Sequence, residues 1–122
     1  MTEQFSCLVH DNGVAEIVLN RPPVNALNAA GWNALAVAIQ AHGERPDVRV
    51  IVVRAEGRGF CAGVDIKEMQ AHPERITLLN RGNYLTFKAI RDAEVPVVSA
   101  VHKFVIGGGI GICGASDTII AA

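Results

Sequence analysis

The sequence has few aromatic residues, few cysteines and no excess of charge of either sign. Only 5% of its 122 residues are Phe, Trp or Tyr, and 11 basic residues against 12 acidic ones give a net charge of -1. This balance excludes a basic nucleic-acid binder, and the 50% hydrophobic content argues against disorder. His, Lys or Gly interrupts every apolar run before it could span a bilayer. We therefore expect one soluble cytoplasmic domain, or part of one, without membrane or nucleic-acid partners.

The three cysteines, Cys7, Cys61 and Cys113, contain no CxxC pair. Neither a disulfide framework nor a zinc site is therefore indicated, and we expect free thiols and no bound metal. The four histidines are scattered and imply no catalytic pair with a serine or cysteine. His102 differs from the others because it lies between a predicted buried strand and a glycine triplet.

Strand-like and helix-like segments alternate along the chain. Segments 6–10 and 14–19 flank Asp11-Asn12-Gly13, whose turn chemistry predicts a β-hairpin. Asn28 is a candidate cap for a helix that ends near Gly43. The β-branched run over 48–53 is typical of a strand that is buried on both faces of a parallel sheet.

The second part of the chain continues this alternation. The pattern predicts helices over 66–70 and 74–91, a strand that begins at Pro96 and another that begins at Thr118. In the longer helix the expected core positions are Ile76, Leu79, Leu85 and Ile90. The order predicts an α/β fold with right-handed crossovers. Because the sequence ends on an apolar run without a polar tail, we expect it to be part of a longer chain.

The glycines of the last segment allow a dinucleotide-binding interpretation. Gly109, Gly111 and Gly114 fit the GxGxxG fingerprint and follow a predicted strand. The acidic residue that would hold the ribose about 20 positions later has no place in this sequence. A dinucleotide-binding domain therefore stays one alternative.

Two glycine-bearing loops, 56–65 and 107–114, each follow a predicted strand and lead into a helix. Such loops could present backbone N–H groups side by side. Two amide donors of this kind stabilise the negative charge that develops on an acyl carbonyl oxygen, each by about 3 kcal/mol. The alternative is that the glycines only let helices pack closely against the sheet.

Three motifs, taken together and in order, resemble the crotonase superfamily of enoyl-CoA hydratases and isomerases. They occupy residues 19–27 (LNRPPVNAL), 57–69 (GRGFCAGVDIKEM) and 107–109 (GGG), the last followed by Ser116-Asp117. The resemblance implies a mixed α/β fold of the ClpP/crotonase kind, a spiral core of ββα repeats, of which this chain is a part. Residues 1–122 would be the N-terminal portion of a single domain, and the full-length form a homotrimer or hexamer.

The resemblance also implies roles for individual residues. The backbone N–H groups of Val64 and Gly108 would form an oxyanion hole for the thioester carbonyl of an acyl-CoA substrate. Backbone around Ala26 and Ala62 would receive coenzyme A, and Lys67 would contact a phosphate. Coenzyme A would be part of the substrate, with no further cofactor.

At Gly111 the sequence departs from the pattern of the hydratases, which usually carry a glutamate there as one of two catalytic carboxylates. The second carboxylate would lie beyond Ala122. We therefore expect an open substrate pocket at Gly111 and keep several functions in view. The leading one is a hydratase/isomerase-family enzyme that stabilises a thioester enolate; the alternatives are a ring-opening hydrolase of a cyclic β-diketo acyl-CoA in steroid catabolism and a non-catalytic acyl-CoA-binding remnant.

Overall fold

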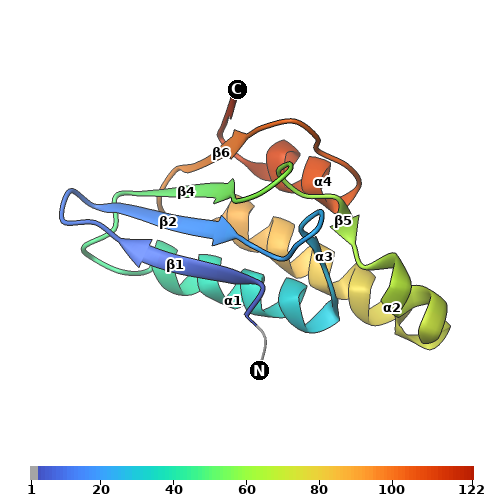
Figure 1. Ribbon diagram of the computed structural model, residues 1–122. Helices are drawn as coiled ribbons and strands as arrows, with labels where there is room; N and C mark the ends of the chain where they lie inside the picture. The colour runs from blue at the N-terminus through green and yellow to red at the C-terminus, as the bar shows by residue number, and fades with distance from the viewer. Residues whose placement is uncertain (1–2) are drawn as a thin grey trace.

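The computed structural model describes residues 3–122, and its centre is a five-stranded sheet (Figure 1). The strands are β1 (Phe5–Val9), β2 (Val14–Leu19), β4 (Val50–Ala55), β6 (Val97–Val101) and β7 (Thr118–Ala121), in the spatial order β1-β2-β4-β6-β7. The pair β1–β2 is the predicted antiparallel hairpin, and every other pair is parallel. The predicted α/β architecture is confirmed.

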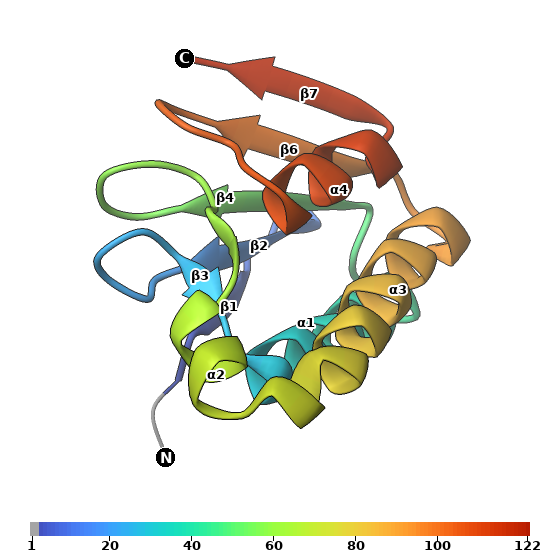
Figure 2. The same cartoon turned by 90° about the vertical axis from the view of Figure 1, so that its right-hand side faces the viewer.

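The helices lie on one side of this sheet (Figure 2). They are α1 (Ala29–Gly43), α2 (Ile66–Ala71), α3 (Ile76–Asp92) and α4 (Gly108–Ala115). Asn28 caps α1 as predicted, because its side chain accepts a hydrogen bond from the Gly31 N–H. A short 3-10 turn, Pro73–Arg75, precedes α3, so that helix begins two residues later than the sequence predicts.

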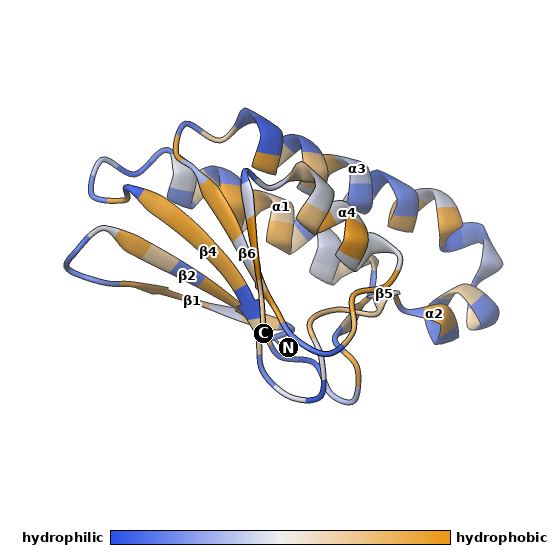
Figure 3. Cartoon of the chain, turned by 90° about the horizontal axis from the view of Figure 1, so that it is seen from above, coloured by the Kyte–Doolittle hydropathy of each residue, from blue (hydrophilic) through white to orange (hydrophobic). Residues whose placement is uncertain are grey.

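The core lies between the sheet and these helices. In β4, Ile51, Val53 and Ala55 are buried, whereas Val50, Val52 and Arg54 are partly exposed. The prediction that this run is buried on both faces is therefore wrong, because helices cover only one face. The open face carries partly exposed apolar side chains such as Val50 and Val52. Figure 3 shows β4 and β6 as hydrophobic along most of their length.

Helix α3 buries a different set of residues from the predicted one. Leu79 and Ile90 are buried, but Ile76 is 47% exposed. The buried face instead includes Gly82 and Thr86, which pack against α1. The Thr86 hydroxyl donates a hydrogen bond of 2.9 Å to the carbonyl oxygen of Trp32 in that helix.

Two short strands that the sequence analysis did not predict form a second, parallel sheet. They are β3 (Ala26–Leu27) and β5 (Gly63–Val64), with Ala26 opposite Gly63. A 56–62 loop joins β4 to β5, and a 102–107 loop joins β6 to α4. These two loops and the segment before β3 position the candidate site.

Candidate functional site

A groove of about 360 Å³ runs between the segment before β3 and the start of α2. Four of the predicted site residues, Ala26, Ala62, Val64 and Lys67, line it together. The remaining lining residues are Arg21, Pro22, Pro23, Val24, Asp65 and Ile66. The structure therefore brings these four residues to one groove, although Ala26 and Lys67 are 41 positions apart in the sequence.

The pairing of β3 with β5 fixes the direction of the Val64 N–H. The next amide, that of Asp65, donates to the Leu27 carbonyl oxygen across the pair at 2.9 Å. Successive N–H groups of a strand point to opposite edges. The Val64 N–H therefore points away from β3.

The N-terminus of α4 lies beside this segment. A Cβ atom added to Gly63 would stand 3.0 Å from the Gly108 nitrogen and 3.2 Å from the Ile106 carbonyl oxygen. Gly108 is the first residue of α4, so its N–H has no acceptor inside the helix and carries part of the positive end of the helix dipole. The structure thus brings the Val64 and Gly108 segments together.

Glycine makes this close approach possible. Gly63 has a φ of +99°, in the left-handed region, and a Cβ atom at Gly109 would stand only 2.4 Å from the Cys61 carbonyl oxygen. The Ile106 N–H donates to that same oxygen at 3.0 Å. Close packing of the two loops is therefore observed, and it is compatible with the presentation of two amides, which stays a prediction.

Asn25 connects the groove to the 56–62 loop, and the sequence analysis missed this role. Its side-chain Nδ2 donates to the carbonyl oxygens of Glu56 and Gly59, both at 2.9 Å, and its Oδ1 accepts from the Arg21 N–H at 2.7 Å. Asn25 is 3% exposed and has a φ of 58°. Asn tolerates the left-handed region better than most residues, which was the available signal.

The groove carboxylate, Asp65, is fully occupied by hydrogen bonds. Its Oδ1 accepts from the N–H groups of Lys67 and Glu68, so it caps α2. Its Oδ2 accepts from the Arg21 guanidinium at 3.1 Å, and the same Nη1 also donates to the Ala26 carbonyl oxygen. Asp65 therefore shapes the groove, and both of its oxygens are engaged in hydrogen bonds within the chain.

Of the predicted site residues, Gly108 and Gly111 do not line the groove. A Cβ atom at this position would stand 2.2 Å from Cζ of Phe87 in α3. The Phe87 ring meets the Trp32 ring edge-on, with centroids 6.3 Å apart and an interplanar angle of 77°. Gly111 and Phe87 both line a separate hollow of about 440 Å³. A substrate pocket at Gly111 stays a prediction.

Cys61 has no role as a nucleophile in this arrangement. Burial raises the pKa of its thiol to about 11, so the thiol stays protonated near neutral pH. In the described residues, 3–122, no group of three or more His, Cys, Asp and Glu side chains could hold a metal ion. No helix in the same range is both long and apolar enough to cross a membrane.

The GxGxxG match lies in the wrong structural context for a dinucleotide site. Gly109, Gly111 and Gly114 all lie inside α4, whereas the fingerprint belongs to the turn that precedes a helix. Gly111 packs against Phe87 rather than facing an open phosphate site. The geometry therefore does not support the dinucleotide-binding alternative.

The chain has similar relatives among curated proteins. A (7aS)-7a-methyl-1,5-dioxo-2,3,5,6,7,7a-hexahydro-1H-indene-carboxyl-CoA hydrolase from Rhodococcus jostii is 49% identical over 113 residues, which are 91% of this chain and 44% of that protein. The Mycobacterium tuberculosis protein of the same name is 48% identical, over 90% of this chain and 45% of that protein. The chain thus spans less than half the length of these relatives.

Solved structures have the same fold. An enoyl-CoA hydratase from Mycobacterium smegmatis matches 98% of this chain and 48% of its own, with a TM-score of 0.91 and 32% identity. An enoyl-CoA hydratase/isomerase (crotonase) from Legionella pneumophila matches 99% of this chain and 48% of its own, with a TM-score of 0.89 and 25% identity. These matches confirm the crotonase-like fold.

The family model described as enoyl-CoA hydratase/isomerase matches residues 10–122. This match, together with the similar structures and sequences described above, shows that the chain belongs to the enoyl-CoA hydratase/isomerase family.

Proposed function

We propose that this chain forms the thioester-binding part of a crotonase-type enzyme that acts on an acyl-CoA. The observation that carries the proposal is the contact between the Gly63–Val64 segment and the first residue of α4. Two N–H groups from these segments would donate to one thioester oxygen as it gains negative charge. Each such donor lowers the barrier by about 3 kcal/mol when it is preorganised and water is excluded.

The groove would hold the coenzyme A part of the substrate. Ala26 and Ala62 stand on its two sides and would offer backbone groups to the adenine. Lys67 lies at its rim with an exposed side chain, where it would contact a phosphate as a point charge. The Arg21–Asp65 ion pair connects the two walls and would keep the groove open before the substrate arrives.

For the reaction itself, we propose ring opening of a cyclic β-diketo acyl-CoA. Two relatives, at 49% and 48% identity, are named as hydrolases of a dioxo-indene-carboxyl-CoA. Water would add to a ring ketone, and the carbon–carbon bond beside that ketone would break, which leaves a carboxylic acid. The bonding electrons would enter an enolate conjugated with the thioester, and this enolate would take up the proton that the water loses. Phe87 against Gly111 also supports this choice, because a hydratase-type glutamate would collide with its ring.

The proton carrier for that reaction would come from outside residues 3–122, since Asp65 is occupied and Gly111 has no titratable group. The same observation favours a second candidate, an acyl-CoA-binding remnant without turnover. We further propose that the whole enzyme works in the cytoplasm as a homotrimer or hexamer, as the family resemblance implies.

Binding and turnover separate these functions. Isotope-edited infrared spectra of acetyl-CoA added to the chain should show the thioester carbonyl stretch shifted to lower frequency. Replacing the Val64 amide by an ester, with the side chain unchanged, removes one N–H and should reduce that shift. An unshifted carbonyl in the unmodified chain would refute the thioester site.

Hydrolysis of a cyclic β-diketo acyl-CoA by the full-length protein would eliminate the remnant, whereas hydration of an enoyl-CoA alone would eliminate ring opening.

A further inference from the structure

One residue of the 102–107 loop holds both ends of a turn in the 56–62 loop. His102 is the first residue after β6, and its imidazole Nε2 lies 2.9 Å from the Gly57 carbonyl oxygen. The carbonyl oxygen of His102 accepts from the Phe60 N–H at 3.1 Å. The ring and the backbone of His102 therefore bracket the four-residue turn 57–60.

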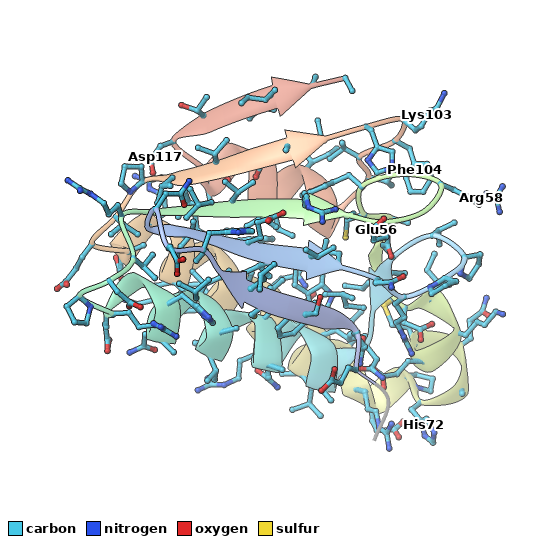
Figure 4. The ribbon with its side chains drawn as sticks, turned by 60° about the vertical axis from the view of Figure 1, so that its left-hand side comes forward. Glu56, Arg58, His72, Lys103, Phe104 and Asp117 are labelled. Atoms are coloured by element: carbon cyan, nitrogen blue, oxygen red, sulfur yellow. The ribbon has the colours of Figure 1, made fainter. Side chains whose placement is uncertain are left out.

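The aromatic ring of Phe104 supports the middle of that turn. A Cβ atom at Gly59 would stand 2.3 Å from Cε2 of Phe104, so the ring lies directly against this glycine. The Phe60 N–H also reaches the Phe104 carbonyl oxygen at 3.1 Å. Figure 4 shows Glu56, Arg58, Lys103 and Phe104 gathered at one end of the sheet, with Asp117 at the other end.

The turn needs such support because of its composition. Gly57 has a φ of +88° and nothing within 4 Å of where its Cβ would be, so its own packing does not hold it. Glycine has more conformational freedom to lose than any other residue. Phe60 leads directly into Cys61, which bridges to Val105, and then into Gly63 and Val64. Motion of the turn would therefore reach the Val64 amide.

The hydrogen bond also defines the state of the imidazole. The Gly57 carbonyl oxygen can only accept, so Nε2 of His102 carries the hydrogen. This nitrogen is thus committed to the loop and is not free to take a proton from a substrate. The contact is therefore structural, and His102 would affect a reaction only through the position of the backbone that it holds.

We propose that His102 is a positioning residue, which holds the 57–60 turn so that the Val64 and Gly108 amides converge on one thioester oxygen. This inference depends on the thioester-binding function proposed above. His102 lies outside the residues that line the groove, so its effect should fall on the carbonyl and not on coenzyme A.

The test compares His102→Leu with His102→Gln in the same chain. Leu removes the donor, whereas the side-chain amide of Gln can still donate to Gly57. With acetyl-CoA as the probe, His102→Leu should lose at least half of the infrared shift of the thioester carbonyl, and His102→Gln should keep most of it. The affinity for free coenzyme A, measured by calorimetry, should stay within about twofold in both variants, because the groove is intact.

The outcomes separate this inference from the function on which it depends. A full carbonyl shift in His102→Leu overturns the positioning role and leaves the thioester site standing. Equal losses in the Leu and Gln variants also overturn it, because the hydrogen bond would then be irrelevant. No shift in the unmodified chain overturns both. If circular dichroism shows that His102→Leu is unfolded, His102→Ala is used in its place. A full shift of the thioester carbonyl in His102→Ala would also overturn the positioning role.

Discussion

Asn25 uses its whole side-chain amide to join two segments that approach each other only in the folded chain. Both Nδ2 hydrogens go to the 56–62 loop, and Oδ1 returns to the Arg21 amide in its own segment. The backbone of the next residue, Ala26, pairs with Gly63. The loop and the strand that follows it are therefore both held from positions 25 and 26.

Replacing Asn25 by Asp should destabilise the fold severely. The change is isosteric, but it removes both donors and places a buried carboxylate against two carbonyl oxygens. We expect a loss of about 3 kcal/mol in the free energy of unfolding, measured by urea denaturation at neutral pH. Asn25→Gly is the matched control, because it keeps the left-handed backbone without strain and adds no charge. Equal losses in the two variants would contradict a role for the buried charge.

Glu16 gives the open face of the sheet a pH dependence. Hydrogen bonds from the Arg54 guanidinium, and then from His10, lower the pKa of this carboxyl below its ordinary value. A lowered pKa in the folded state means that ionised Glu16 stabilises the fold above its unfolded pKa, and that this contribution is lost as the pH falls through the folded value.

Glu16→Gln tests this contribution. Because the pair is partly exposed, the variant should be less stable than the unmodified chain by under about 1 kcal/mol at pH 7. The difference should shrink as the pH falls below the ordinary range of a glutamate and disappear once Glu16 is protonated in the folded state as well. Denaturation curves at several pH values measure it. A difference that stayed constant with pH would mean that the charge of Glu16 is not involved.

Helices α3 and α4 approach one another through glycine and an aromatic ring. Phe87 occupies the space beside Gly111, and it packs edge-on against Trp32 of α1 at the same time. An alanine at position 111 gains helix propensity but must displace that ring. The two effects have opposite signs.

The effect of Gly111→Ala should therefore depend on residue 87. With Phe87 present, we expect the substitution to destabilise the chain by about 1 kcal/mol, because crowding outweighs propensity. In a Phe87→Ala background it should stabilise by about 1 kcal/mol, since helix propensity is then unopposed. A double-mutant cycle from thermal or urea unfolding gives the coupling. Additive effects would show that the ring does not fill this space.

At the level of elements, local signals predicted more than long-range ones. The hairpin turn at residues 11–13 and the Asn28 cap act over a few residues, and both are confirmed. The strands β3 and β5 have only two residues each and exist because the loops that carry them meet, which no periodicity records. The burial of β4 on both faces was wrong because a β-branched run does not say how many faces are covered.

Some residues of the candidate site could likewise be predicted from the sequence, and others could not. The glycine loops and the residues Ala26, Ala62, Val64 and Lys67 could be predicted because a family resemblance marks them, and the groove brings them together. Asn25 and His102 act through hydrogen bonds to residues up to 34 and 45 positions away. The local sequence does not show which residues they contact. Gly111 lacks a side chain, and the sequence alone does not show that the Phe87 ring occupies the space beside it.

At the scale of the whole molecule, as described over residues 3–122, the main sheet ends in two edge strands, β1 and β7. All four residues of β7 are exposed, and Ile119 and Ile120 are 52% and 59% exposed. β7 pairs with β6 on one side, and no other described strand pairs with its second edge (Figure 2). Open, apolar edge strands are templates for association.

We therefore expect the chain to self-associate through β7 in dilute buffer. Ile120→Lys should shift the sedimentation profile toward monomer at equal protein concentration, because a charge on an edge strand opposes pairing. Val37→Lys, on the outer side of α1 at 66% exposure, is the matched control and should leave the profile unchanged. A profile that moved equally in both variants would assign the effect to net charge.

The two proposed oxyanion donors belong to the main chain, and this has a consequence for how such a protein can diverge. A side chain at position 64 could be exchanged without removing the amide beneath it, whereas position 63 tolerates only a hydrogen atom where a Cβ would meet Gly108. Substrate preference could therefore drift at Val64 while the electrostatic function persists. In a saturation library, position 64 would therefore accept many substitutions, whereas position 63 would accept almost none.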